Sequence, residues 1–226
     1  QILKFNAKNK KIKNTICIIP IRGLEEDTIS FKKINNQTIL YKIINEIKKT
    51  DNIKKIIISS PDIKILKKVK KKYKKDILTI KRERDLAGYN IPITKTLVSI
   101  VKKIRSKIYF DSILKINVDH PLLNKQNFES AINIMNIFNT DEVIAVKKEN
   151  DKFYYHNGKG MIEFHNSKNL TLEREEVYRS IGSLHLMKKK CLLNYNKKRK
   201  IGHLIVDEVS AFRVKNEDDI KISETL

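Results

Sequence analysis

Short apolar runs rich in isoleucine alternate with segments of helical periodicity through the first 150 residues, and this alternation constrains the fold more than any other feature. Residues 15–21 (TICIIPI) and 53–60 (IKKIIISS) are β-branched and apolar on both faces, which is typical of central strands in a parallel sheet. The segment between them has one apolar helical face, made by Ile39, Leu40, Ile43, Ile44 and Ile47. This alternation predicts an α/β fold, with a mostly parallel sheet and helices on both of its faces.

The same patterning extends the prediction along the chain. Further strands are expected at 76–80, 112–118, 142–148, 182–189 and 203–208. Helices are expected after Pro61, around Leu97 and Phe128, and at 216–225, where three carboxylates favour a helix N-terminus. The stretch 152–160 is typical of a hairpin. Because no repeat or Pro/Ser/Gly linker interrupts the chain, residues 1–226 are expected to form one domain, with an arm or lid inserted at about 150–180.

The composition excludes several classes of protein. A chain of 226 residues with 40% hydrophobic residues can bury the core of one domain. It contains no apolar run of about 18 residues, so no membrane span is expected. Cys17 and Cys191 form neither a metal-binding spacing nor a disulfide framework, and Cys17 is expected to pack as a small hydrophobe. The basic first residues lack an apolar signal core, so a cytoplasmic location is expected.

A net charge of +22 raises the question of nucleic-acid binding. The densest basic block, 67–76, has Val69 and Tyr73 spaced four apart on an apolar side, which favours a solvated helix face over a binding patch. No zinc-finger spacing, RNP-like aromatic motif or Gly/Arg-rich tail supports nucleic-acid recognition. A basic nucleic-acid-binding protein therefore stays the weakest of the functional hypotheses.

In a parallel α/β sheet, ligands bind beyond the carboxyl ends of the strands, so the loops after residues 21, 60, 80 and 118 are the candidate site. Arg22 and Gly23 follow the first strand: an arginine can hold a phosphate oxygen, and glycine permits close approach, although a turn would also explain them. Asp119 follows another buried strand, where its carboxylate could hold Mg²⁺ or could form a turn with Pro121.

Other candidate residues lie in loops and near strand ends. Ala87 and Gly88 leave little side-chain bulk, which would let a base or sugar approach the backbone. Arg174 and Arg179 precede an expected strand, and Asp207 and Glu208 end another. The five histidines form no metal-binding spacing, and no Ser/His/Asp or Cys/His triad can be assembled.

In order and spacing, several segments resemble the CMP-sugar synthetases, the cytidylyltransferases that activate acylneuraminate and 3-deoxy-octulosonate sugars. "IIPIRG" resembles IPARGGSKG, "RDLAGYN" resembles ELAGDT, "NVDHPLL" falls where the family has QPTSPLR or QGDEPL, and "YRSIGSLHL" resembles the NGAIYI segment. The resemblance implies a Rossmann-like, GT-A-like nucleotidyltransferase fold with a protruding dimerisation arm, and hence a homodimer. It also implies CTP and an anionic sugar as substrates, with Mg²⁺ as cofactor.

Residue roles follow from the same resemblance. It implies that Arg22 and Asp119 are catalytic, with Arg22 on the triphosphate and Asp119 ligating the metal. It implies that the nucleotide also meets Gly23, Lys32, Ala87 and Gly88, and that the acceptor meets Arg174 and Arg179. Asp207 is a second candidate metal ligand.

The sequence departs from the family at two places. Leu24, Glu25, Glu26 and Asp27 stand where the family has Ser-Lys-Gly, and the DID metal motif falls on Arg213-Val214-Lys215. A cation cannot ligate Mg²⁺, but it can contact a phosphate directly. Two hypotheses therefore stay open: a working, diverged cytidylyltransferase, or a catalytically silent relative that binds nucleotide, sugar or a protein partner.

Overall fold

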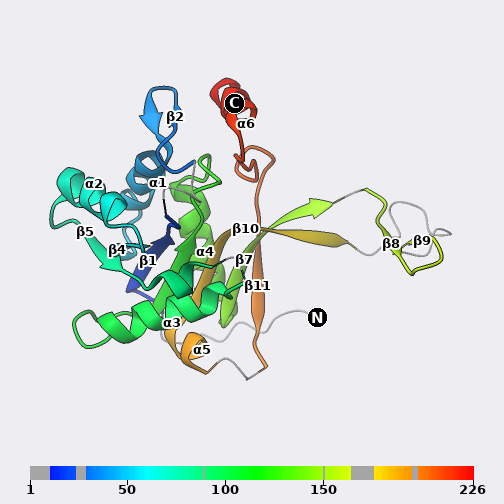
Figure 1. Cartoon of the computed structure of the whole chain (residues 1–226). Helices are drawn as coiled ribbons and strands as arrows, with labels where there is room; N and C mark the ends of the chain where they lie inside the picture. The colour runs from blue at the N-terminus through cyan, green and yellow to red at the C-terminus, as the bar shows by residue number, and fades with distance from the viewer. Residues whose placement is uncertain (1–10, 24–28, 89, 150, 164–175, 195–197) are drawn as a thin grey trace.

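The computed structural model describes residues 11–23, 29–88, 90–149, 151–163, 176–194 and 198–226. Its centre is a seven-stranded sheet of order β11-β7-β10-β6-β1-β4-β5 (Figure 1). The strands are β1 Thr15–Pro20, β4 Ile53–Ser60, β5 Ile77–Lys81, β6 Ser112–Ile116, β7 Glu142–Glu149, β10 Val177–Lys188 and β11 Ile201–Ile205. The expected mostly parallel sheet is confirmed.

β10 is the one antiparallel strand of this sheet. It pairs antiparallel with both β6 and β7, whereas β1–β4, β1–β6, β4–β5 and β7–β11 are parallel pairs. The reason is the connection between β7 and β10. β7 leads into a protruding hairpin, here called the arm, formed by β8 (Tyr154–His156) and β9 (Met161–Glu163), and the chain then returns beside β7 as β10 (Figure 1). The carboxyl ends of the other six strands therefore share one edge of the sheet, to which β10 contributes its amino end.

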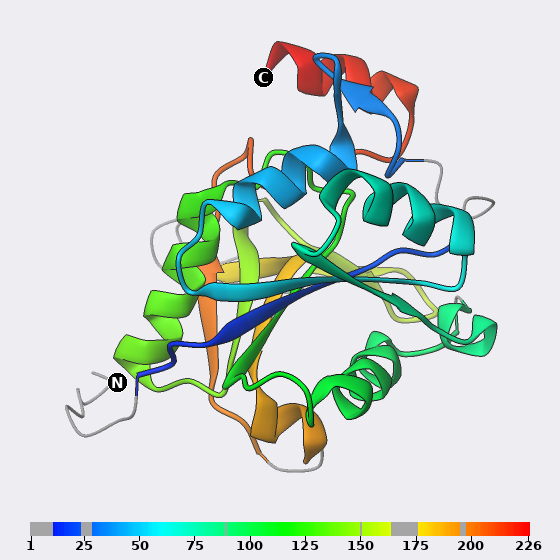
Figure 2. The same cartoon turned by 90° about the vertical axis from the view of Figure 1, so that its left-hand side faces the viewer.

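Helices cover both faces, as expected. They are α1 Ile39–Lys48, α2 Ile63–Tyr73, α3 Ile93–Ile104, α4 Lys125–Phe138, α5 Lys189–Leu193 and α6 Glu217–Thr225, with a short 3₁₀ turn, η1, at Arg84–Ala87. Figure 2 shows α1 and α2 on one side of the sheet and α3 and α5 on the other. Cys17 and Ile19 pack with α1, α2 and α4, while Ile16 and Ile18 pack with α3 and α5, so alternate β1 side chains enter two cores. Cys17 is fully buried, as expected, and burial raises the pKa of its thiol.

Helix starts differ slightly from the sequence-based expectation. α2 begins at Ile63 rather than directly after Pro61, because the Asp62 carboxylate accepts a hydrogen bond from the backbone N–H of Lys64 at 2.7 Å. In α6, Asn216 is the N-cap and exchanges side-chain hydrogen bonds with Asp219 in a capping box. The three carboxylates of the first turn still complement the helix dipole there.

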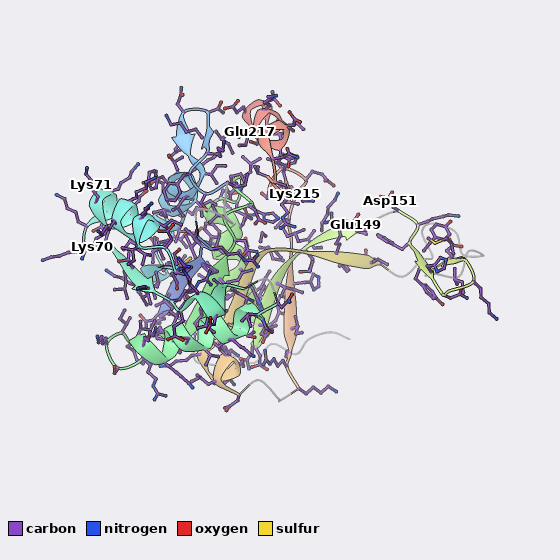
Figure 3. All side chains as sticks on the ribbon, viewed as in Figure 1. Lys70, Lys71, Glu149, Asp151, Lys215 and Glu217 are labelled. Carbon is purple, nitrogen blue, oxygen red and sulfur yellow. The ribbon has the colours of Figure 1, made fainter. Side chains whose placement is uncertain are left out.

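The basic block on α2 is confirmed as largely a solvent-facing helix surface. Val69 is fully buried, whereas the lysines are exposed, and Figure 3 shows Lys70 and Lys71 extending away from the body. Lys72 Nζ lies 3.8 Å from the centre of the Tyr41 ring, a cation–π contact that occupies one of these charges within the protein.

The C-terminal helix α6 contacts a short hairpin that follows the β1 loop. A hairpin formed by β2 (Lys33–Ile34) and β3 (Gln37–Thr38) turns through Asn35 and Asn36, which have φ of +49° and +62°. Figure 2 shows α6 beside this hairpin, and the backbone N–H of Asn35 donates to Glu224 Oε1 at 3.1 Å. Lys32 also forms an ion pair with Glu217.

The expected hairpin after residue 150 is confirmed: β8 (Tyr154–His156) pairs antiparallel with β9 (Met161–Glu163), beyond the body of the sheet (Figure 1). Tyr154, Tyr155 and Met161 are each at least half exposed on it. In the part of the chain that the structure describes, no helix is both long and apolar enough to cross a membrane.

Candidate functional site

The loop after β1 is held by buried polar contacts at the carboxyl edge. The backbone N–H of Ile21 donates to the Ser59 carbonyl at 2.8 Å, and Ser60 Oγ donates to the carbonyl of Arg22 at 3.1 Å. Arg82, which is only 4% exposed, donates from Nη2 to the Ile21 carbonyl at 2.9 Å. These contacts set where Arg22 and Gly23 leave the sheet. Sequence analysis missed Arg82, although its place directly after a strand was a usable signal.

Asp119 joins the loop after β6 to the segment after β11. Its Oδ1 lies 2.8 Å from His120 Nδ1, and its Oδ2 accepts from Arg213 Nε at 2.7 Å. Its backbone carbonyl accepts from the N–H of Val214 at 2.8 Å. Burial acts to raise the pKa of Asp119, but the hydrogen bonds and charges of His120 and Arg213 outweigh it and hold that pKa below its usual value.

A β-bulge interrupts the pairing of β10 with β7. The β7–β10 register shifts between Ser180 and His185, and Gly182 between them has φ of +69°. The Gly182 carbonyl accepts from Lys115 Nζ at 2.8 Å and from Asn117 Nδ2 at 2.9 Å. The bulge is therefore anchored by one side chain of β6 and by the residue directly after that strand.

Lys115 is an unusual residue for a central strand. It is 6% exposed, and burial lowers the pKa of its ammonium to about 8, although the negative charge of Asp119 acts to raise it. Sequence analysis missed it too. The signal was a single lysine within the otherwise apolar run SILKINV.

A polar cavity of about 250 Å³ lies between these elements at the carboxyl edge. It is lined by His120, Arg179, Ser180, Ile181, Ala211, Arg213, Lys215 and Asp219. Figure 3 places Lys215 between β11 and α6, and Glu149 at the end of β7 where the arm begins. Arg179 Nε donates to Glu149 Oε1 at 2.5 Å. The cavity thus presents three cationic side chains and one carboxylate, and its chemistry favours an anion.

The sequence-predicted residues divide into separate groups. Arg179 lines the cavity, and Asp119 lies beside it through its contact with the lining residue Arg213. Arg22, Gly23, Ala87 and Gly88 belong to the loops after β1 and β5 and are not among the described lining residues.

Three more predicted residues lie elsewhere. Lys32 is paired with Glu217 on α6. Asp207 closes a local turn, since its two carboxylate oxygens accept from the backbone N–H and the hydroxyl of Ser210 at 2.7 and 3.1 Å. Arg174 and the acidic stretch 24–27 lie outside the described residues.

The residues around Asp119 do not fit a divalent cation in this arrangement. Both of its carboxylate oxygens already have partners, and one partner is the cation Arg213. Within the described ranges, no group of three or more His, Cys, Asp or Glu side chains could hold a metal ion. Mg²⁺ at Asp119 or Asp207 stays a sequence-based prediction.

Neither a protein-family model nor a curated protein matches the chain. Among solved structures, it is similar to 4-diphosphocytidyl-2C-methyl-D-erythritol synthase from Anaerococcus prevotii, with 15% identity, a TM-score of 0.68 and coverage of 94% of this chain and 95% of that one. A second synthase of this name has 12% identity and a TM-score of 0.68, covering 96% and 99% of the two chains. CMP:2-keto-3-deoxy-manno-octonic acid synthetase complexed with CTP has 12% identity and a TM-score of 0.63, covering 85% and 90%.

These likenesses extend over nearly the whole chain, and at such low identity they show the fold. The expected nucleotidyltransferase-type α/β fold is therefore confirmed, and it is the fold of cytidylyltransferases of more than one kind. The finer resemblance to the acylneuraminate branch is not singled out by them, because two of the three similar structures carry a different synthase name.

Proposed function

We propose that this protein is a cytidylyltransferase-type nucleotidyltransferase that activates an anionic sugar with CTP, giving a CMP-sugar and pyrophosphate. The observation that carries the proposal is the cavity lined by Arg179, Arg213 and Lys215, which lies beside Asp119 at the carboxyl edge of the sheet. Positive charge is concentrated there at the edge where this class of fold receives its ligands. The similarity to a synthetase complexed with CTP supports the choice of nucleotide.

In the proposed reaction, a sugar hydroxyl attacks the α-phosphorus of CTP. The new bond joins that oxygen to phosphorus, the bond to the β-phosphate oxygen breaks, and pyrophosphate leaves with the electron pair, while the hydroxyl proton passes to solvent. Arg22 contacts the triphosphate, while Ala87 and Gly88 lie near the nucleotide. Arg179, with Arg174, faces the acceptor. Positioning and the charges of basic side chains stabilise the developing negative charge.

A second candidate function is nucleotide or sugar binding without turnover. The ion pair between Asp119 and Arg213 favours it, because it engages the carboxylate that the resemblance assigns to the metal. The two candidates share a binding site and differ only in whether pyrophosphate is released.

The discriminating experiment incubates the full chain with CTP, Mg²⁺ and a panel of acidic sugars and follows pyrophosphate release. Arg22→Gln is expected to lower kcat about a hundredfold, because it removes a donor to the triphosphate. Arg105→Gln is the matched control, since Arg105 is an exposed residue directly after α3, at the amino end of the sheet. No release with any acceptor, together with heat on CTP binding, would establish the second candidate.

We also propose that the protein forms a homodimer through the arm. The exposed Tyr154, Tyr155 and Met161 supply apolar surface that a partner arm could cover. Light scattering on the purified protein measures the molar mass directly. A monomer at every concentration tested contradicts this proposal.

A further inference from the structure

We propose that the cavity beside Asp119 is a metal-independent oxyanion site, in which Arg213 supplies the positive charge and Asp119 positions the guanidinium. The ligand class is a compact anion with clustered oxygens, such as a pyrophosphate group or the carboxylate of a sugar acid. The inference rests on the proposed function for the source of this anion, while the site itself follows from the contacts described above.

Arg213 is both fixed and available. Its Nε donates to Asp119 Oδ2 at 2.7 Å, and its side chain is 55% exposed at the cavity. Within the described residues, the other guanidinium N–H groups have no hydrogen-bond partner. A guanidinium held at one nitrogen can present its terminal N–H groups to two oxygens of a ligand. The ion pair therefore orients Arg213 without using its whole donor capacity.

Two further cations complete the site. Lys215 lines the cavity, and the Asp219 carboxylate fixes its backbone N–H at 2.7 Å, while Nζ has no ion-pair partner in the described part of the chain. Arg179 is held in the same manner as Arg213, with Nε on Glu149 and its terminal groups left for a ligand. The site thus combines two oriented guanidinium groups and the ammonium of Lys215, drawn from β10 and the segment after β11.

The nearby carboxylates are already engaged, which limits their repulsion of an anion. Asp219 Oδ2 accepts from the backbone N–H groups of Lys215 and Asn216, at 2.7 and 3.2 Å. Asp119 and Glu149 are each paired with an arginine. A divalent cation at Asp119 would instead stand next to Arg213 and be repelled by it, so the same position favours an anion over a metal.

The test is calorimetric titration of the full chain with inorganic pyrophosphate, first in EDTA and then in Mg²⁺. We expect binding in EDTA that Mg²⁺ does not strengthen. Arg213→Gln is expected to weaken binding about tenfold to a hundredfold, because a charge-assisted contact is lost, whereas Arg105→Gln leaves it unchanged. Binding that requires Mg²⁺, or binding that Arg213→Gln leaves intact, would overturn the proposal.

The positioning role of Asp119 has its own readout. Asp119→Asn keeps an oxygen that can accept from Arg213 Nε, so pyrophosphate affinity in EDTA is expected to stay within about threefold of the unchanged protein. Asp119→Ala removes that acceptor and is expected to weaken binding about tenfold. If the asparagine variant binds as poorly as the alanine variant, Asp119 does not act by orienting Arg213. Thermal unfolding of each variant establishes that it is folded.

A parallel titration with galacturonate distinguishes the source of the anion. Arg213-dependent binding of pyrophosphate alone identifies the nucleotide side of the reaction, and Arg213-dependent binding of galacturonate identifies the acceptor side. Binding of neither overturns the site. Because no step requires turnover, these titrations stand apart from the pyrophosphate-release assay, and either proposal can fail without the other.

Discussion

The two halves of the sheet are held together in different ways. In the half formed by β1, β4 and β5, apolar side chains on both faces enter continuous cores, and Ile16, Ile18 and Ile19 are fully buried. In the half formed by β6, β10, β7 and β11, a bulge and buried polar groups interrupt the pattern, and Lys115 donates to the Gly182 carbonyl. The first half is a scaffold that tolerates little loss of volume. In the second half, the β10 bulge interrupts regular strand pairing beside the cavity.

The largest expected effect comes from the hydrophobic core that contains Phe128, to which both halves of the sheet contribute side chains. Phe128 on α4 is fully buried against the sheet, and Phe128→Ala is expected to lower the free energy of unfolding by about 3–5 kcal/mol through lost burial and the cavity left behind. Phe138→Ala, at the exposed end of the same helix, is the matched control and should change it by less than about 1 kcal/mol. Chemical denaturation measures both. Equal losses would contradict the assignment of the core.

The pH dependence of the free energy of unfolding tests the burial of Lys115. Its pKa is about 8 in the folded protein against an ordinary 10.5, so below pH 8 both the folded and unfolded states are protonated and the full cost of burying the charge is present. Between pH 8 and 10.5, Lys115 loses its proton in the folded state but keeps it in the unfolded state. The wild-type protein therefore gains stability with rising pH relative to Lys115→Met. The gain should reach about 3 kcal/mol by pH 10.5.

Denaturation of the two proteins at several pH values measures this difference. Lys71→Met is the control, because Lys71 is an exposed residue on α2 and its removal should leave the pH dependence as it is. If the difference in unfolding free energy between the wild-type protein and Lys115→Met does not change between pH 8 and 10.5, Lys115 is not buried as a cation.

Gly182 tests the bulge itself. Its φ of +69° is unfavourable for other residues, whereas no atom within 4 Å would meet an added Cβ, so Gly182→Ala is expected to destabilise the protein by about 1 kcal/mol through backbone strain alone. Gly160→Ala is the matched control, since that glycine has equal space and no positive φ. Denaturant midpoints compare the two. If Gly182→Ala leaves the denaturant midpoint unchanged, the bulge does not depend on a positive φ at this position.

The smallest effect is expected at Lys32. Its ion pair with Glu217 is exposed on both sides, so a double-mutant cycle with Lys32→Gln and Glu217→Gln should give a coupling below about 1 kcal/mol. The same Lys32→Gln variant tests the nucleotide-binding role by CTP titration. A loss of CTP affinity with little change in stability would support that role, and unchanged affinity would assign Lys32 to the contact with α6.

The sequence alone was sufficient for much of the first half of the chain. Strands β1 and β4 and helices α1 to α4 follow from local periodicity, which the chain encodes residue by residue. Asp119 was predicted at the ligand edge because it follows a buried strand, and its role there stays a sequence-based prediction. β10 was predicted only from residue 182, although it begins at Val177, since its first residues pair with β7 at the base of the arm.

The sequence by itself determined the α/β class and the alternation of elements, because each depends on patterns within a few residues. Only the tertiary structure decided what Asp119 contacts. Arg213 lies 94 positions away, and Lys115 and Gly182 are 67 positions apart. Such pairs depend on strand order and on one bulge, which no local pattern encodes. Arg213 falls where the resembled family has its DID motif. Its guanidinium contacts the Asp119 carboxylate because the loop after β6 and the segment after β11 meet at the same edge of the sheet.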